Sequence, residues 1–535
     1  MELRIAGDLK ARTIRLRRTP ITFPVQNLSE TDRKVVVKLI KAADFMSEIF
    51  LRQVSPLNVE TRRMLEASGD ALSHEALKYF RINFGPWDRL SGNEPFIGDR
   101  PKPAGAGFYP EDMSKEEFQK WVEERPEEKS SFTSLFTVVR RQGSGLVAVP
   151  YSKEYREFLA PASELLKEAA EMTENKSLQR FLMSRAGAFL KDDYFQSDMD
   201  WMDLDSTLEV TIGPYEVYED GLFGYKAAFE AFVTVNDQAE SAKLRKYASL
   251  LPDMELHLPI LDQYKNTQRG TESPIRVVNE LYTGGDARKG IQISAFNLPN
   301  DEKIREAKGS KKVLLKNVME AKFKSCFRPV ASRLISRDQL DFVTFEAYFN
   351  QVLFHELSHG LGPGVIVKPN GTRGEVRMEL KELYSAIEEA KADATGLWNI
   401  LHMIDIGVIE KKMEAQECVT YAAGHFRAAR FGLHEAHGMA VVSQFNFLRD
   451  RGAMASDSVG RFRIKLPLMK ETIRDLTHEL LMIEAEGSYT KAKEFLDKYG
   501  KVPPELEEAL TKVADLPIDI EPDYEVLKKI EISRP

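Results

Sequence analysis

The stretch that decides the fold of the second half of the chain is Phe345-Glu346-Ala347-Tyr348-Phe349-Asn350-Gln351-Val352-Leu353-Phe354-His355-Glu356-Leu357-Ser358-His359. Its hydrophobic residues recur at intervals of three and four, which predicts an α-helix. The glycines and the proline of residues 360–364 follow directly and end that helix. His355 and His359 therefore lie one turn apart on one face, where both imidazoles reach the same metal ion.

The glutamate between the two histidines suggests what such a metal would do. In the pattern His-Glu-x-x-His the histidines bind zinc and the glutamate, here Glu356, lies beside the ion. From there it can take a proton from a water on the zinc and pass it to a leaving amine. Because this pentapeptide also occurs by chance, the interpretation needs support from other residues.

A second predicted helix supplies that support. Its hydrophobic stripe ends at Gly407, and it carries Glu389 and Asp393 four residues apart. Glu389 can provide the third metal ligand, and Asp393 can hydrogen-bond a ligand imidazole from behind. A third histidine ligand six residues after His359 is excluded, because that position is Val365.

With both motifs identified, the sequence resembles the dipeptidyl-peptidase III family of zinc exopeptidases. In that family a Glu-Glu-x-Arg-Ala-Glu motif follows the histidine helix, and its second Glu is a zinc ligand. The segment Glu388-Glu389-Ala390-Lys391-Ala392-Asp393 matches it, with Lys and Asp in place of Arg and Glu. The resemblance implies that Glu389 is the ligand and that Glu388 supports the site. One departure is that the family's helix motif usually has one more residue between its histidines.

Two further segments resemble parts of the family's substrate site. The segment Ile212-Gly213-Pro214-Tyr215-Glu216-Val217-Tyr218-Glu219-Asp220 implies that Glu216 binds the amine of the substrate and that Tyr218 stabilises the oxyanion. The segment Asn297-Leu298-Pro299-Asn300 implies that Asn297 and Asn300 contact the N-terminal part of a bound peptide. Judged only by their patterns, these residues would be an exposed strand face and a turn.

A third segment, Glu435-Ala436-His437-Gly438, resembles the family stretch whose histidine stabilises the tetrahedral intermediate. The resemblance assigns that role to His437. His434 and His437 are three residues apart, so a second metal pair and a surface pair are the alternatives.

The remaining patterns predict a mainly helical α+β protein. Residues 30–79 and 310–515 have helical periodicity, and residues 205–300 form a β-rich region interrupted by a helix at 238–250. The proline-rich tail after residue 503 is expected to be extended. The family implies two lobes around a wide cleft. One would be helical and carry the zinc (239–283 and 328–499), and the other would contain a five-stranded β-barrel (1–238, 284–327 and about 500–535).

Composition narrows the functional classes. The 535 residues carry a net charge of -8, which offers no broad attraction to nucleic acid or anionic lipid. No stretch approaches the ~18 apolar residues of a membrane span, and the basic N-terminus lacks the apolar core of a signal peptide. Two cysteines, Cys326 and Cys418, cannot form a disulfide framework, and we expect a cytoplasmic protein.

The sequence therefore predicts a monomeric or homodimeric exopeptidase with one zinc ion per chain, which releases dipeptides from the N-terminus of short peptides. One alternative is a zinc aminopeptidase or oligopeptidase with different cleavage spacing. Another is a non-catalytic peptide-binding protein with a structural metal. Structural zinc usually has four protein ligands, so three favour an open site. A phosphate-binding loop is not indicated, because no Gly-Lys-Ser/Thr follows Gly284-Gly285.

Overall fold

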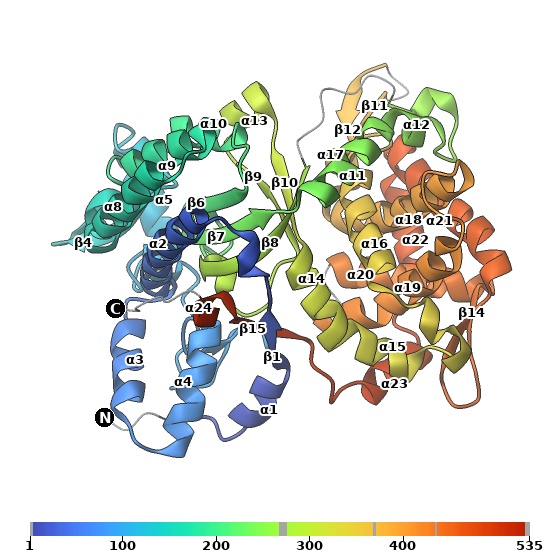
Figure 1. The fold of residues 1–535 in the computed structure, drawn as a ribbon, viewed down its shortest axis with the longest axis horizontal. Helices are drawn as coiled ribbons and strands as arrows, with labels where there is room; N and C mark the ends of the chain where they lie inside the picture. The colour runs from blue at the N-terminus through green and yellow to red at the C-terminus, as the bar shows by residue number, and fades with distance from the viewer. Residues whose placement is uncertain (1–3, 267–274, 368–370, 434–435, 530–535) are drawn as a thin grey trace. The chain divides into compact units, whose positions relative to one another are not determined.

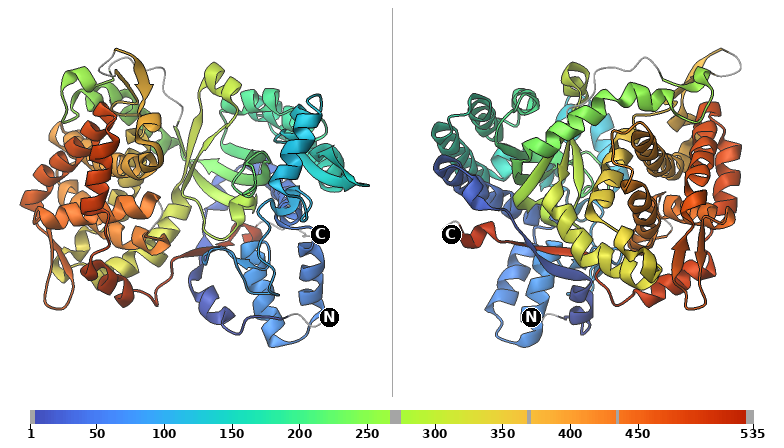
Figure 2. Two further views of the ribbon diagram at one scale, coloured as in Figure 1. Left: turned by 180° about the vertical axis from the view of Figure 1, so that it is seen from behind. Right: turned by 45° about the vertical axis from the view of Figure 1, so that its right-hand side comes forward.

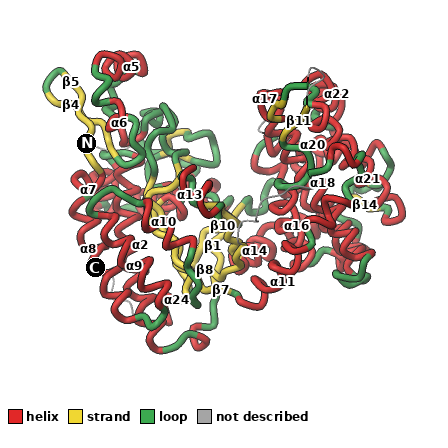
Figure 3. Tube along the Cα trace, turned by 90° about the horizontal axis from the view of Figure 1, so that it is seen from above, coloured by secondary structure: helices red, strands yellow, loops and turns green. Residues whose placement is uncertain are grey.

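The computed structural model describes residues 4–266, 275–367, 371–433 and 436–529 (Figure 1). The chain divides into two compact units, which are described separately. Unit 1 comprises Met1–Ser241, Ser273–Val318 and Glu521–Pro535, and unit 2 comprises Ala242–Glu272 and Met319–Ile520. Helices predominate and the strands are few (Figure 3), as the sequence predicts.

The largest differences between these boundaries and the predicted ones are at three places. Residues 275–283, expected in the helical part, belong to strand β8 (Ile275–Gly285) of unit 1. Residues 319–327 and 500–520, expected with the sheet, belong to unit 2. Strand β8 lies in unit 1 because it pairs with two other strands of the same sheet.

The sheet of unit 1 has five strands in the order β6 (Leu208–Glu216), β7 (Ala228–Asn236), β8, β10 (Lys311–Leu315) and β9 (Ala295–Leu298). The β8–β10 pair is parallel and the other pairs are antiparallel. Within the described residues no pairing joins β9 to β6, so the prediction of a closed barrel is wrong. Closure requires every strand to have two neighbours, and β9, only four residues long, pairs with β10 alone.

Helix α2 (Glu30–Val54) of unit 1 packs against β7 and β8 (Figures 1 and 2). The buried Gln53 side chain accepts from the Phe229 backbone N–H at 2.9 Å and donates to the Ala227 carbonyl at 3.2 Å, which ties this helix to β7. The other helices of unit 1 are α1 (Leu9–Ile14), α3 (Asn58–Ala67), α4 (Ala71–Asn83), α5 (Lys115–Glu124), α6 (Lys129–Phe132), α7 (Tyr151–Glu154), α8 (Arg156–Met172), α9 (Lys176–Phe189), α10 (Phe195–Met202), α13 (Glu302–Lys308) and α24 (Val526–Lys529). Its short strand pairs are β2 (Trp87–Asp88) with β3 (Glu94–Pro95) and β4 (Thr137–Gln142) with β5 (Gly145–Pro150).

Unit 2 is a helical body with two small hairpins. The unit boundaries fall inside α11 (Gln238–Ser249) and α14 (Lys316–Lys322). Its other helices are α12 (Leu251–Leu256), α15 (Arg328–Leu334), α16 (Phe345–Ser358), α17 (Val376–Leu380), α18 (Tyr384–Asp405), α19 (Met413–Ala428), α20 (Ala436–Asp450), α21 (Leu466–Glu486), α22 (Tyr489–Tyr499) and α23 (Pro504–Lys512). The hairpins pair β11 (Val365–Val367) with β12 (Arg373–Glu375), and β13 (Met454–Ser456) with β14 (Phe462–Ile464). In the part of the chain that the structure describes, no helix is long and apolar enough to cross a membrane.

The tail contains more regular structure than predicted. Helix α23 begins at Pro504, a first-turn position where the missing N–H of proline is no loss. Further on, β15 (Asp519–Tyr524) pairs with β1 (Leu16–Ile21). The extended conformation expected for the whole tail is therefore correct only for part of it.

The helices that bear the predicted metal ligands meet in the core of unit 2. Thr344 caps the start of α16 by accepting from the Ala347 backbone N–H. Helix α18 is largely buried and packs against α16, α20 and α21. Helix α18 comes close to α16 at Gly396, where an added Cβ would lie 3.1 Å from the His355 backbone nitrogen. A glycine at this position sets how near the two ligand-bearing helices come.

We predict that Gly396→Ala lowers the stability of the protein by ~1–3 kcal/mol, because the added methyl meets backbone atoms of α16. This loss exceeds the ~1 kcal/mol that alanine gains over glycine in helix propensity. Denaturant unfolding measures the difference. Gly424→Ala in α19 is the matched control, since its Cβ would lie 3.8 Å from the Phe327 ring, an ordinary contact. A Gly396→Ala protein as stable as the control would contradict the close-approach argument.

Candidate metal centre

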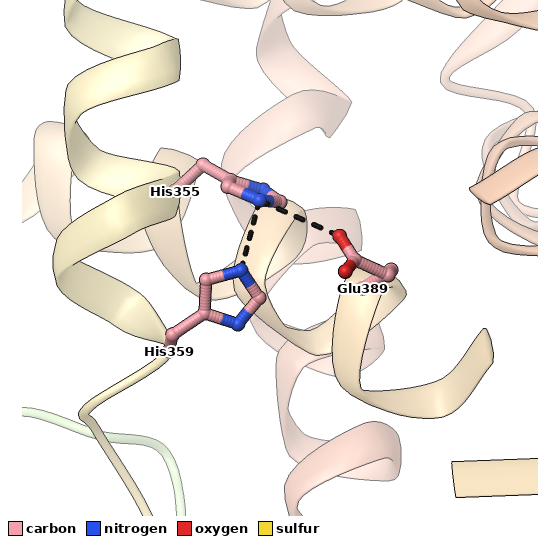
Figure 4. Close-up of side chains that lie close together, drawn as sticks. All are labelled: His355, His359 and Glu389. Carbon is pink, nitrogen blue, oxygen red and sulfur yellow. Dashed lines mark hydrogen bonds and ion pairs between the residues drawn. The ribbon is translucent and has the colours of Figure 1, made fainter. Parts of the chain in front are cut away.

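Two histidines and one glutamate of unit 2 point toward one another (Figure 4). His355 lies in the last turn of α16, His359 directly follows that helix, and Glu389 lies in the second turn of α18. The two Nε2 atoms are 3.0 Å apart, and Glu389 Oε2 is 3.5 Å from His355 Nε2. The His359 N–H donates to the His355 carbonyl, so the backbone stays helical through the motif. This is the arrangement that the i, i+4 spacing predicts.

Each imidazole is held from behind by a carboxylate. Asp393 Oδ1 lies 2.7 Å from His355 Nδ1, and Glu388 Oε1 lies 2.8 Å from His359 Nδ1. A carboxylate at Nδ1 favours a proton on that nitrogen, which leaves the Nε2 lone pair free to bind a metal. The structure thus places Glu388 and Asp393 where a supporting role requires them.

The donor set fits a divalent cation better than it fits an empty site. Glu389 Oε2 is buried and receives no hydrogen bond from the described residues. Burial disfavours a charge on His355, but the carboxylates of Asp393, Glu389 and Glu356 outweigh it and raise the pKa of this residue to about 9. The surroundings therefore favour positive charge between the two rings. Two nitrogens and one carboxylate oxygen are typical zinc ligands.

Two other predicted catalytic residues lie near these ligands. Glu356 follows His355 in the last turn of α16 and is partly buried. His437, in the first turn of α20, has a side chain that is 79% exposed, and its Nε2 is 3.3 Å from Glu389 Oε2. The exposed imidazole of His437 thus lies beside the predicted ligand Glu389. His434, the other half of the alternative metal pair, lies outside the described residues.

The predicted substrate-binding residues belong to unit 1. Glu216 ends β6, and a hydrogen bond links its carboxylate to Asn300. Asn300 also donates to the Tyr215 carbonyl at 3.3 Å. Burial, and then the nearby Asp286, raise the pKa of Glu216, so a cation in this place would be stabilised. The structure therefore brings Glu216 and Asn300 together.

The other two predicted residues of unit 1, Tyr218 and Asn297, differ in exposure. Tyr218 is 80% exposed in the loop between β6 and β7, so its hydroxyl is free to meet a ligand. Asn297 lies in β9, where its side-chain oxygen is buried and receives no donor from the described residues. Both residues thus have capacity for a further hydrogen bond.

Sequence reasoning missed residues that hold the metal-site carboxylates. Gln444 of α20 donates to Asp393 Oδ2 at 2.9 Å, and Glu484 of α21 lies 4.0 Å from Lys391, which donates to Glu388. Gln444 could have been noticed as an amide among the hydrophobic residues of α20. Nothing in the sequence relates Glu484 to a residue 96 positions before it.

A family model and two solved structures point to a peptidase family, and one relative carries a different name. Residues 142–373 match the model of peptidase family M49. The structure of DPP III from Caldithrix abyssi is 50% identical, with a TM-score of 0.95, and the match covers 97% of this chain and 100% of that chain. Dipeptidyl-peptidase III from Corallococcus sp. strain EGB is 40% identical, with a TM-score of 0.82 and 98% of each chain covered. A third relative, Nudix hydrolase 3 from Arabidopsis thaliana, is 37% identical over 97% of this chain and 75% of its own length.

Glu417, a buried glutamate on α19, is expected to make the stability of the protein depend on pH. Glu417 accepts from Asn350 of α16 at 2.8 Å, and burial raises its pKa to about 8. The folded protein therefore keeps a proton that the unfolded chain, with an ordinary glutamate, loses as the pH rises. The stability that depends on this proton is complete below about pH 4.5 and is lost as the pH rises toward 8.

We predict that Glu417→Gln removes this pH dependence, because an amide does not ionise. The difference in unfolding free energy between Glu417→Gln and the unchanged protein should grow by roughly 1.4 kcal/mol per pH unit between pH 5 and 7.5. Denaturant titrations across this range measure it. The exposed Glu494→Gln in α22 is the control and should give no slope. A flat difference for Glu417→Gln would mean that Glu417 is ionised in the folded protein.

Proposed function

Because the chain belongs to the dipeptidyl-peptidase III family, peptidase family M49, and is a metallopeptidase, we propose that it is a zinc-dependent exopeptidase that releases dipeptides from the N-terminus of oligopeptides. The observation that carries the zinc assignment is the pair of Nε2 atoms 3.0 Å apart beside a buried carboxylate oxygen without a donor. One zinc ion per chain would be held by His355, His359 and Glu389. When bound, zinc supplies a Lewis acid for the scissile carbonyl and lowers the pKa of a coordinated water toward ~7.

The protein's own residues would then move the protons. Glu356 accepts a proton from the attacking water and returns it to the leaving nitrogen. The carboxylates of Asp393 and Glu388 keep the two ligand imidazoles in the tautomer that binds metal. His437 and Tyr218 donate hydrogen bonds to the oxyanion that develops on the substrate.

The exopeptidase specificity would come from unit 1. Glu216 accepts hydrogen bonds from the α-ammonium group of the substrate, and Asn297 and Asn300 bind the backbone of its first residues. The raised pKa of Glu216 supports this role, since a buried carboxyl near another carboxylate gains most from a cationic ligand. Fixing the free amine fixes which peptide bond meets the reacting water, and so the length of the product.

Nucleotide hydrolysis is not part of the proposal. The relative named Nudix hydrolase 3 has a quarter of its length outside the match, which covers 75% of it. The part of that relative that matches covers 97% of this chain, which carries the peptidase motifs.

We expect Glu356→Gln to lower kcat by about 10²- to 10⁴-fold while zinc content stays at one per chain, because the general base is removed and the ligands remain. Glu389→Gln should instead weaken zinc binding. Metal analysis paired with a dipeptidyl-naphthylamide assay measures both. Glu346→Gln, on the exposed first turn of the same helix, is the control and should change neither. A fully active Glu356→Gln enzyme would refute its role, and unchanged zinc in Glu389→Gln would place the third ligand elsewhere.

Glu216→Gln should reduce kcat/KM for peptides with a free N-terminus by about 10- to 100-fold, because a charged hydrogen bond is worth ~1.5–3 kcal/mol. The same peptides with an acetylated N-terminus should be cleaved no more slowly by the variant than by the unchanged enzyme. Mass spectrometry of the products shows whether dipeptides are released stepwise. Products of another length would support the aminopeptidase or oligopeptidase alternative. An equal loss of kcat/KM on free and acetylated peptides would show that Glu216 does not bind the amine.

A further inference from the structure

A chain of hydrogen bonds runs outward from His355 through four helices of unit 2. Asp393 of α18 lies behind the imidazole, with its Oδ1 2.7 Å from His355 Nδ1. Gln444 of α20 donates from Nε2 to the other oxygen of the same carboxylate, Oδ2, at 2.9 Å. Tyr421 of α19 in turn donates its hydroxyl proton to Gln444 Oε1. The candidate metal ligand is thus connected to a tyrosine through two intervening side chains.

The direction of each bond in this chain follows from what the groups can donate. A glutamine amide has two different ends, a carbonyl oxygen that only accepts and an NH₂ group that only donates. A carboxylate has acceptor oxygens only, so Asp393 requires the NH₂ end of Gln444. The hydroxyl of Tyr421 supplies a proton to the carbonyl end. Tyr421 therefore stabilises the amide orientation that Asp393 needs.

Both side chains are enclosed in the helical core. Gln444 is 0% exposed and Tyr421 is 6% exposed. The Tyr421 ring packs edge-on against His425, one turn later in α19, with ring centroids 4.8 Å apart. A buried acceptor that loses its donor keeps the cost of its desolvation. The carbonyl oxygen of Gln444 therefore depends on the Tyr421 hydroxyl.

Helix α19, which carries Tyr421, is fixed to the start of α16. Thr420 Oγ1 accepts from the Thr344 backbone N–H at 3.3 Å and donates to the Phe342 carbonyl at 3.2 Å. Thr344 is the residue that caps the start of α16, whereas His355 lies in the last turn of that helix. Tyr421 is thus held by contacts that do not depend on the metal ligands.

We propose that Tyr421 is a positioning residue of the metal site, which acts through Gln444 and Asp393 to keep Nε2 of His355 directed at the metal. The inference rests on the proposed zinc site, and it concerns how one ligand of that site is held. Without the hydroxyl, the buried carbonyl of Gln444 has lost its donor. The amide can relieve this cost only by leaving the conformation in which it holds Asp393. The imidazole of His355 then loses its fixed orientation and binds zinc more weakly.

The test measures the zinc dissociation constant of the full-length, metal-free chain by competition with a chromogenic chelator, without reference to activity. Tyr421→Phe keeps the ring and removes only the hydroxyl, and we expect it to bind zinc about 5- to 20-fold more weakly. Gln444→Leu removes the amide and should bind zinc about 10- to 100-fold more weakly, the usual effect of losing support behind a ligand.

The double variant separates positioning from general damage. If Tyr421 acts through Gln444, adding Tyr421→Phe to Gln444→Leu should change zinc affinity by less than about twofold, because the hydroxyl then has no amide to hold. The losses caused by two independent contacts would instead multiply.

Tyr499→Phe is the matched control for loss of a buried tyrosine hydroxyl. Tyr499 of α22 is 4% exposed, and its hydroxyl donates to Asp450 at 3.3 Å. Its ring packs against Phe447 of α20, the helix that carries Gln444. Its replacement should leave zinc affinity unchanged. Thermal unfolding of the metal-free proteins shows which variants fold, and if Gln444→Leu does not, the comparison of Tyr421→Phe with Tyr499→Phe decides.

The outcomes separate the positioning role from the proposed function. An unchanged protein that does not bind zinc overturns the proposed function, and the inference with it. If the unchanged protein binds zinc and Tyr421→Phe binds it equally well, only the positioning role is wrong. Losses that multiply in the double variant would show that Tyr421 does not act through Gln444. An equal loss in Tyr499→Phe would show a general loosening of the bundle, which also overturns the positioning role.

Discussion

Two imidazole nitrogens 3.0 Å apart, each turned outward by a carboxylate behind its ring, are the constraint on which the rest of unit 2 depends. Both lone pairs face the same point, so the pair is stable only with a cation or a proton between them. The surrounding helices maintain the geometry of the two imidazoles. Gly396 lets α18 approach α16, and the backbone of α16 stays helical up to His359. A wider separation of the two helices would leave Glu389 out of reach of the histidines.

Gathering so many charges in a helical core is possible because they neutralise one another. Lys391 balances Glu388, and burial raises the pKa of the nearby Glu484. The side chain of Gln444 holds the second oxygen of Asp393. The buried network therefore has few unsatisfied groups, as a polar cluster inside a hydrophobic core requires. Among the buried atoms that receive no hydrogen bond from the described residues is Glu389 Oε2, the oxygen that faces the histidines.

In unit 1, the exposed Tyr218 lies in the loop between β6 and β7, and buried contacts hold this loop. Glu219, directly after Tyr218, is 2% exposed and accepts from Arg89 at 2.9 Å and lies 2.8 Å from Lys102. Burial opposes its ionisation, but these cations hold its pKa well below the ordinary range. Asp220 accepts from the backbone N–H groups of the next residues of the loop and from the Tyr109 hydroxyl. Two anchored carboxylates thus fix the backbone that carries Tyr218.

The sequence by itself determined the helix at 345–358, the metal-ligand candidates and the mainly helical class, because these follow from spacing along one or two helices. The comparisons confirm the family and the α+β class. Only the tertiary structure decided that the sheet is open, that α23 begins at Pro504, and that Gln444 holds the carboxylate behind His355. Periodicity reports which face of a segment is buried. It does not report which distant segment covers that face. The order of the strands and the partners of buried polar groups depend on that segment.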